Sequence, residues 1–313
     1  MKKIVLSAFF ACLATLAFAQ VEEDTTGSTM AQPVRKPVEF AWEQEEVGPF
    51  SEPISYVYQK NADVMYYHTI WRQIDLREKM NHPLYFPQET RGTWRSMAQV
   101  IFDALDVQNT ERTDALPIYS DEYCTIPMSR EDVKASLVEI KHTEQIDPET
   151  YEVIGEIEYP EPFTASQVLL YRVKEIWFFD KKRSVLDVRI LELEPMIEYE
   201  KETNSGEPRP GEEEEEAVGA IKSKKRVGFI LYDELRPYLA KQEVYNPKNN
   251  AQRISLDDLM TWKREFSSYI YQEQNVYNNR QIDEYMANAR DQRIESERIT
   301  EKIRKFEHDL WEF

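Results

Sequence analysis

The chain has 313 residues, and 58 acidic against 39 basic side chains give it a formal net charge of −19 at pH 7. Such a chain is a poor candidate for binding nucleic acid or anionic lipid, because phosphate recognition needs clustered Lys and Arg. Its 8 glycines are under half the usual share of about 7%, and the glycine motifs of nucleotide-binding loops and nucleophile elbows are missing from the sequence.

The first 19 residues have the layout of a secretory signal peptide. Two lysines precede an apolar run from Ile4 to Phe18, and residues 17–19 (AFA) form a small-x-small cleavage pattern. The run is short for a membrane span. We expect cleavage after Ala19 and export of an even more acidic chain. Cys124 would then be the one remaining cysteine, which leaves no intramolecular disulfide.

Residues 20–50 are rich in Thr, Glu and Pro, which favours a flexible or extended arm. Phe40, Trp42 and Phe50 could anchor this arm to a partner or to the protein's own surface.

Residues 51–150 are predicted to form a mainly helical subdomain. A helix over 70–79 would place Trp71 and Ile74 on one face and end at His82-Pro83. A second helix is expected after a cap at Thr93, and a third after the capping-box pattern S-x-x-D at residues 129–132. Their apolar faces would be Trp94, Met97, Ile101, Ala104 and Leu105 in one helix, and Val133, Leu137 and Ile140 in the other.

Residues 151–313 are predicted to form a β-hairpin followed by C-terminal helices. From residue 168, two β-branched and aromatic runs flank DKKR, which is typical of a hairpin. Residues 200–226 carry an acidic and then a basic run, which indicates a mobile, solvated loop; a calcium-binding or basic-partner role for Glu212–Glu216 is the alternative. Helices are expected from Asp233, with Pro237 in the first turn, and after Ser255, with Leu259, Met260, Phe266 and Ile270 inward.

The C-terminus is predicted to be a long amphipathic helix. Two interruptions, Gln292 and Ser296, should make its stripe weaker in the middle than at its ends. The stripe is spaced by three and four residues and consists of Ile282, Tyr285, Ala289, Gln292, Ser296, Ile299, Ile303, Phe306, Leu310 and Phe313. The predicted fold class is therefore α+β, with helices around a small antiparallel or mixed sheet.

No pattern in the sequence predicts catalysis. The densest titratable stretch is IDLREKMNHPLYFP at 74–87, where a hydrolytic site would recruit Asp75, Glu78 and His82. Nothing marks a nucleophile or an oxyanion hole, and local ion pairs and a turn explain the same residues. Cys124 lacks a basic neighbour, and the histidines lack metal-ligand spacing. We predict no catalytic, cofactor or metal residues.

Five ordered blocks cover most of residues 70–313 and leave out 20–50 and 200–226. The blocks are WRQIDLREKMNHPLYFP, WFFDKKRSVLDVRILELEP, RPYLAKQEVYNPKNNAQR, FSSYIYQEQNVYNNRQIDEY and ESERITEKIRKFEHDLWEF. Together they resemble the GldN/PorN family of gliding-motility and type IX secretion proteins. Parts of the first and third blocks, LREKMNHPLYFP and LRPYLAKQEVYNP, are alike over a few positions, too few to predict a duplication.

The resemblance implies a non-enzymatic periplasmic subunit that self-associates in a ring under the outer membrane, without inserting into it. Its implied partners are a GldK/PorK-like lipoprotein and the periplasmic domain of a GldM/PorM-like motor protein. An exported hydrolase and a cell-wall-binding module remain alternatives. The candidate partner-binding residues are Trp71, Ile74, Ile299, Ile303, Phe306, Leu310, Trp311 and Phe313.

Overall fold

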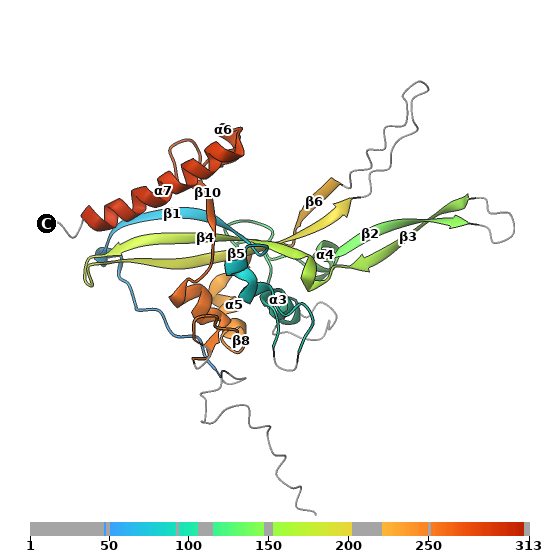
Figure 1. The fold of residues 1–313 in the computed structure, drawn as a ribbon, viewed down its shortest axis with the longest axis horizontal. Helices are drawn as coiled ribbons and strands as arrows, with labels where there is room; N and C mark the ends of the chain where they lie inside the picture. Colours follow the sequence, from blue (N-terminus) through green and yellow to red (C-terminus); the bar gives the residue numbers. More distant parts are fainter. Residues whose placement is uncertain are drawn as a thin grey trace, which may run out of the picture. The chain divides into compact units, whose positions relative to one another are not determined.

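The computed structural model describes residue 47 and residues 51–91, 94–105, 115–146, 153–201, 221–249 and 252–309 (Figure 1). All of them belong to one compact unit that spans residues 46–313. The expected signal peptide, most of the arm and the acidic run at 212–216 lie outside the described residues. The described part is α+β, which confirms the predicted fold class.

A curled antiparallel sheet forms the centre of the fold. Its strands follow the order β10-β1-β4-β5-β6, and the short β7 also pairs with β5. The bounds are β1 Val64–Asp75, β4 Val168–Asp180, β5 Val185–Lys201, β6 Ile221–Arg226, β7 Ile230–Leu231 and β10 Tyr269–Glu273. The hairpin predicted from residue 168 is confirmed as β4 and β5. The predicted loop at 200–226 is wrong at both ends, because β5 and β6 pair there.

β1 shows that the helix predicted over 70–79 is wrong. Ile70 and Ile74 lie on one face of this strand and Trp71 on the other, and all three are buried. Because both faces are covered, the alternation typical of a strand is hidden, and the spacing of Trp71 and Ile74 imitates a helix. His82-Pro83 begins the short helix α2 (His82–Tyr85) instead of ending one, with Pro in the first turn.

The predicted helices at 93–105 and 129–140 are present but differ in their bounds. α3 (Met97–Leu105) buries four of the five predicted apolar side chains, whereas Trp94 precedes the helix and is only partly buried. The cap of α3 is Ser96, which exchanges hydrogen bonds with Gln99, while Thr93 is outside the described residues. α4 (Arg130–Ser136) has the predicted cap, Ser129. It ends early, because β2 (Val138–Ile146) and β3 (Val153–Pro162) form a two-stranded hairpin. Ile140 therefore lies in a strand.

The C-terminal half also departs from the prediction in detail. α5 (Tyr232–Leu239) carries Pro237 in its interior, and β8 (Glu243–Val244) pairs with β9 (Ile254–Ser255). The π-helix η4 (Asp258–Lys263) follows the predicted cap at Ser255. It ends at Lys263, so Phe266 and Ile270 lie beyond it, and Ile270 belongs to β10. The remaining short 3₁₀ turns are η1 Asn61–Asp63, η2 Lys79–Asn81 and η3 Ala165–Gln167.

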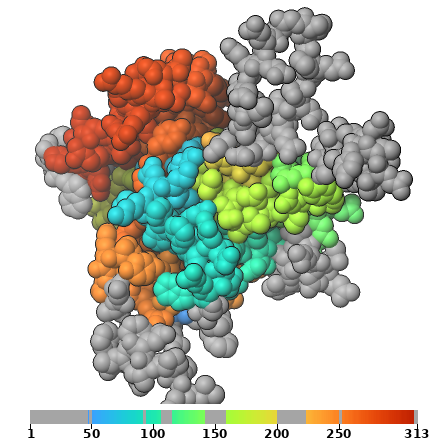
Figure 2. All heavy atoms as spheres, turned by 45° about the vertical axis from the view of Figure 1, so that its right-hand side comes forward, coloured from blue at the N-terminus to red at the C-terminus, as the bar shows by residue number. Residues whose placement is uncertain are grey.

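Two hydrophobic cores use the same face of the sheet. The larger packs Ile74 and Tyr171 against side chains of α3, α5 and η4. The smaller packs Ile70 and Ile270 against α6 (Ile282–Tyr285) and α7 (Ala289–Asp309). Figure 2 shows α7 as a ridge on the outside of the molecule. No helix among the described residues is long and apolar enough to cross a membrane.

The long C-terminal helix is confirmed as α7, but it is held differently from the prediction. The predicted stripe breaks between α6 and α7, and Ser296 is buried together with Ile299 and Ile303. The Ser296 hydroxyl accepts the backbone N–H of Ile270 at 2.8 Å, which satisfies a donor of the edge strand β10. The middle of the helix is therefore firmly attached, and the prediction of a weak middle is wrong.

Candidate functional site

Four of the predicted partner-binding residues are buried inside the described chain. Trp71 and Ile74 lie on opposite faces of β1, and Ile299 and Ile303 hold α7 on the sheet. Phe306 is half-buried, with its ring centroid 4.2 Å from that of Tyr66. Leu310, Trp311 and Phe313 lie outside the described residues. Partner binding through this set stays a prediction, and the four buried side chains stabilise the fold.

Asp75 and His82, two of the three residues considered for hydrolysis, make local packing and ion-pair contacts. Asp75 pairs with Arg77 at 2.7 Å. Burial opposes ionisation of Asp75, but hydrogen bonds from Arg77 lower its pKa below the usual value. His82 packs edge-on against Phe86, with ring centroids 5.4 Å apart. Across the described residues, no hydrogen bond joins Asp75 to His82.

Cys124 is placed in surroundings that suppress thiol reactivity. Its Sγ lies 4.0 Å from Oε2 of Glu192. Burial and the nearby Glu192 carboxylate raise the pKa of Cys124 to about 11. Reactive thiols need the opposite, an electropositive setting that lowers the pKa.

A charged cluster on the Trp71 face of the sheet fastens residues 119–126. The Trp71 indole donates to Glu122 at 2.9 Å. Lys174 pairs with Glu122 at 2.9 Å, lies 3.7 Å from Glu192, and sits over the rings of Trp71 and Tyr123. Burial raises the pKa of Glu192 to about 8, although Lys174 acts to lower it. The cluster holds a loop on the sheet and leaves a cavity of only about 60 Å³.

A second charged group separates the two hydrophobic cores on the other face. Glu175 is fully buried and accepts hydrogen bonds from Arg72 at 3.1 Å and Arg264 at 2.6 Å. The indole of Trp177 donates to the same carboxylate at 3.1 Å. We call Arg72, Glu175 and Arg264 the polar seam. Arg72 comes from β1, Glu175 from β4 and Arg264 from the end of η4. Sequence spacing therefore did not reveal this cluster.

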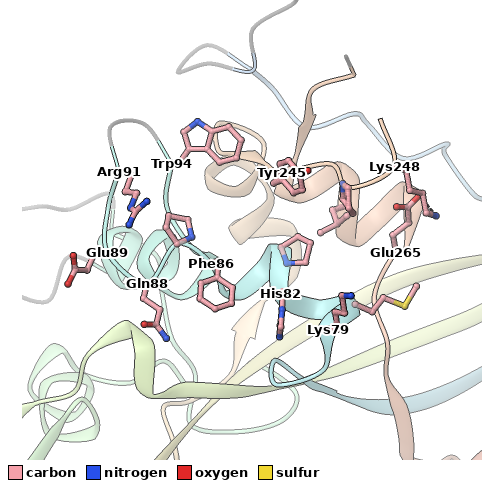
Figure 3. A pocket seen from close by; sticks show the side chains of 15 residues that line it. Lys79, His82, Phe86, Gln88, Glu89, Arg91, Trp94, Tyr245, Lys248 and Glu265 are labelled. Atoms are coloured by element: carbon pink, nitrogen blue, oxygen red, sulfur yellow. Dashed lines mark ion pairs between the residues drawn. The ribbon is translucent and has the colours of Figure 1, made fainter. Parts of the chain in front are cut away.

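The strongest candidate for a functional site is a groove of about 980 Å³ (Figure 3). Residues 79–94 and residues 245–265, far apart in sequence, line it together. Met80, Phe86 and Tyr245 are about half-exposed in it. The apolar part of its lining includes Met80, Pro83, Phe86, Trp94, Tyr245 and Pro247.

Buried hydrogen bonds make the first wall of the groove rigid. Asn81 is fully buried; its amide donates to the carbonyl oxygens of Asp75 at 2.7 Å and Ser267 at 2.8 Å, and accepts the N–H of Ser267 at 2.7 Å. Leu84 anchors α2 in the larger core. With the turn fixed from inside, Met80 and Phe86 are directed outward, so the stretch 74–87 is a packing element that also presents a surface.

The opposite wall is fixed in the same way. The buried Asn246 side chain accepts the backbone N–H groups of Lys248 and Asn249. Lys248 pairs with Glu265 at 3.1 Å across the groove's end. Tyr245 and Pro247 are thus presented on a stiff turn. The two short stretches that are alike in sequence, ending in HPLYFP and EVYNP, supply the two walls.

The groove has the properties of a docking surface. Half-exposed apolar patches rimmed by polar residues are typical of sites that bind proteins or ligands. Sequence reasoning missed Met80, Phe86 and Tyr245, because their exposure depends on Asn81 reaching Ser267, 186 positions along the chain. The family-like blocks around residues 82–87 and 245–248 were the available signal.

One comparison with known proteins identifies the family. A family model described as "Gliding motility associated protein GldN" matches residues 59–312, which include both walls of the groove and every described strand. No match is found among curated proteins. The resemblance inferred from the five sequence blocks is therefore confirmed, and the chain belongs to the GldN family of gliding-motility-associated proteins.

Proposed function

We propose that this chain is a non-enzymatic structural subunit of the type IX secretion and gliding machinery. With a GldK/PorK-like lipoprotein it would form a periplasmic ring that engages the GldM/PorM-like motor protein. Family membership supports the link to gliding motility. We assign partner docking to the groove, because buried hydrogen bonds hold its half-exposed aromatic lining rigid.

The proposed location is the periplasm, with attachment to the outer membrane through the lipoprotein. Deleting the lipoprotein should move the chain from the outer-membrane fraction to the soluble periplasmic fraction, or lower its amount. The native mass of the complex extracted from outer membranes should fall at the same time. Retention in the outer-membrane fraction without the lipoprotein would contradict the proposal.

A cell-wall-binding module is the second candidate, favoured by the rings of Phe86, Trp94 and Tyr245 in one groove. Aromatic faces offer flat apolar surfaces against which a sugar ring can pack. Sedimentation with purified peptidoglycan tests it: binding that is lost in Trp94→Ala would favour this module, and co-purification with the lipoprotein alone would favour the ring subunit.

A further inference from the structure

Cations at the two ends of the groove restrict what it can bind. Lys79 lies at one end and Arg91 at the other (Figure 3). Neither forms an ion pair with another described residue, whereas Lys248 is already paired with Glu265. Glu89 lies at the outer margin, and its carboxylate is directed away from the groove. Two positive charges that form no ion pair within the described part of the chain therefore flank the apolar middle.

The middle of the groove is suited to aromatic or proline side chains. Phe86 lies at its centre, and the rings of Trp94 and Tyr245 line the opposite side. Grooves lined by aromatic side chains commonly bind extended peptides, which insert alternate side chains into them. The complementary ligand is thus an extended segment with aromatic side chains between two carboxylates.

The chain itself contains such a segment. Residues 39–43 read Glu-Phe-Ala-Trp-Glu and follow Pro37-Val38. Phe40 and Trp42 are two residues apart, so in an extended segment they point to the same side. The segment lies outside the described residues, and its chemistry is taken from the sequence alone.

We propose that the groove binds residues 39–43 of a second copy of this chain. Phe40 and Trp42 of one copy enter between Phe86, Trp94 and Tyr245 of the next, and the flanking glutamates pair with Lys79 and Arg91. Because segment and groove are different parts of the chain, the contact is heterologous and links copies head to tail, which gives a ring when the rotation closes. This inference rests on the proposed ring function and names the contact that builds the ring.

The test compares self-association of two full-length variants by sedimentation velocity. The segment variant is Phe40→Ala with Trp42→Ala, and the groove variant is Lys79→Glu with Arg91→Glu. Each should self-associate about tenfold or more weakly than the natural chain, since aromatic anchors and desolvated charge pairs dominate interfaces. An equimolar mixture should form pairs that grow no further, because it contains one intact groove for each intact segment.

Charge reversal and a matched control make the test specific. Adding Glu39→Lys and Glu43→Lys to the groove variant should restore self-association. Val276→Ala with Tyr277→Ala removes side chains that are 91% and 73% exposed elsewhere and should change nothing. Unchanged thermal unfolding of each variant shows that the fold is intact.

Several results would overturn the inference. They are a natural chain that does not self-associate, a segment variant that associates normally, a failed charge-reversal rescue, or binding of the segment within its own copy as seen by intramolecular cross-linking. Failure of the proposed function is read separately, by co-purification with the lipoprotein. Head-to-tail association without lipoprotein binding would contradict the proposed function but support the proposed contact between copies.

Discussion

At the scale of single residues, Glu192 should make stability depend on pH. Burial raises its folded-state pKa from 4.5 to about 8, so between these values the folded chain holds a proton that the unfolded chain has lost. The free energy of unfolding should therefore fall as pH rises through this window, by up to roughly 1.4 kcal/mol per pH unit. Below pH 4.5 both states are protonated and the effect disappears.

Glu192→Gln removes this titration. The variant should unfold at a higher temperature than the natural chain at pH 8, with a flatter dependence of the unfolding free energy between pH 5 and pH 8. Urea unfolding across that range measures it. Equal slopes for the two proteins would show that Glu192 is already ionised at neutral pH in the folded state.

Ser296 should also contribute measurably to the free energy of unfolding. Ser296→Ala leaves the buried N–H of Ile270 without its partner, and an unsatisfied buried donor costs about 1–3 kcal/mol. Arg293→Ala, on the exposed side of the same helix, is the control and should be nearly neutral. Similar urea midpoints for both variants would mean that water replaces the hydroxyl.

At the scale of elements, α7 should be attached chiefly through Ile299. Ile299 is fully buried in the smaller core, whereas Ile294 in the same helix is 53% exposed. Ile299→Ala should lower the free energy of unfolding by about 2–5 kcal/mol, and Ile294→Ala should change it by no more than about 0.5 kcal/mol. Thermal unfolding followed by circular dichroism compares them, and equal losses would contradict the assigned packing.

The elements also show what sequence can predict and where it stops. The β4–β5 hairpin was predictable because two β-branched runs flank a turn, and the caps at Ser129 and Ser255 are local four-residue patterns. β1 was misread because both of its faces are buried. The groove was beyond prediction, since its walls are brought together by contacts such as Asn81 with Ser267. Structure that depends on neighbouring residues can be predicted from a short stretch of sequence. A surface built from distant segments cannot.

At the scale of the whole molecule, the proposed role in secretion should not require side-chain chemistry. Cys124→Ser and His308→Ala remove the thiol and an imidazole on the exposed side of α7. Both variants should secrete cargo at the natural rate when their cellular amounts match. The measurement is cargo in the medium against the level of the assembled complex. A large loss of secretion with normal assembly would reveal a catalytic or metal role.

The polar seam lies between the two hydrophobic cores, so the two cores can separate from each other along it. Arg72 lies between Ile70 and Ile74 on β1, so each hydrophobic core ends at the same buried ion group. Proteins open locally in cooperative units, and water can solvate these charges as soon as the two cores separate. A load applied to α7 would therefore detach α6, α7 and β10 first. The larger core would stay folded, and these elements could refold onto it. If the chain bears load in the proposed ring, this region would open and refold while the rest of the molecule keeps its fold.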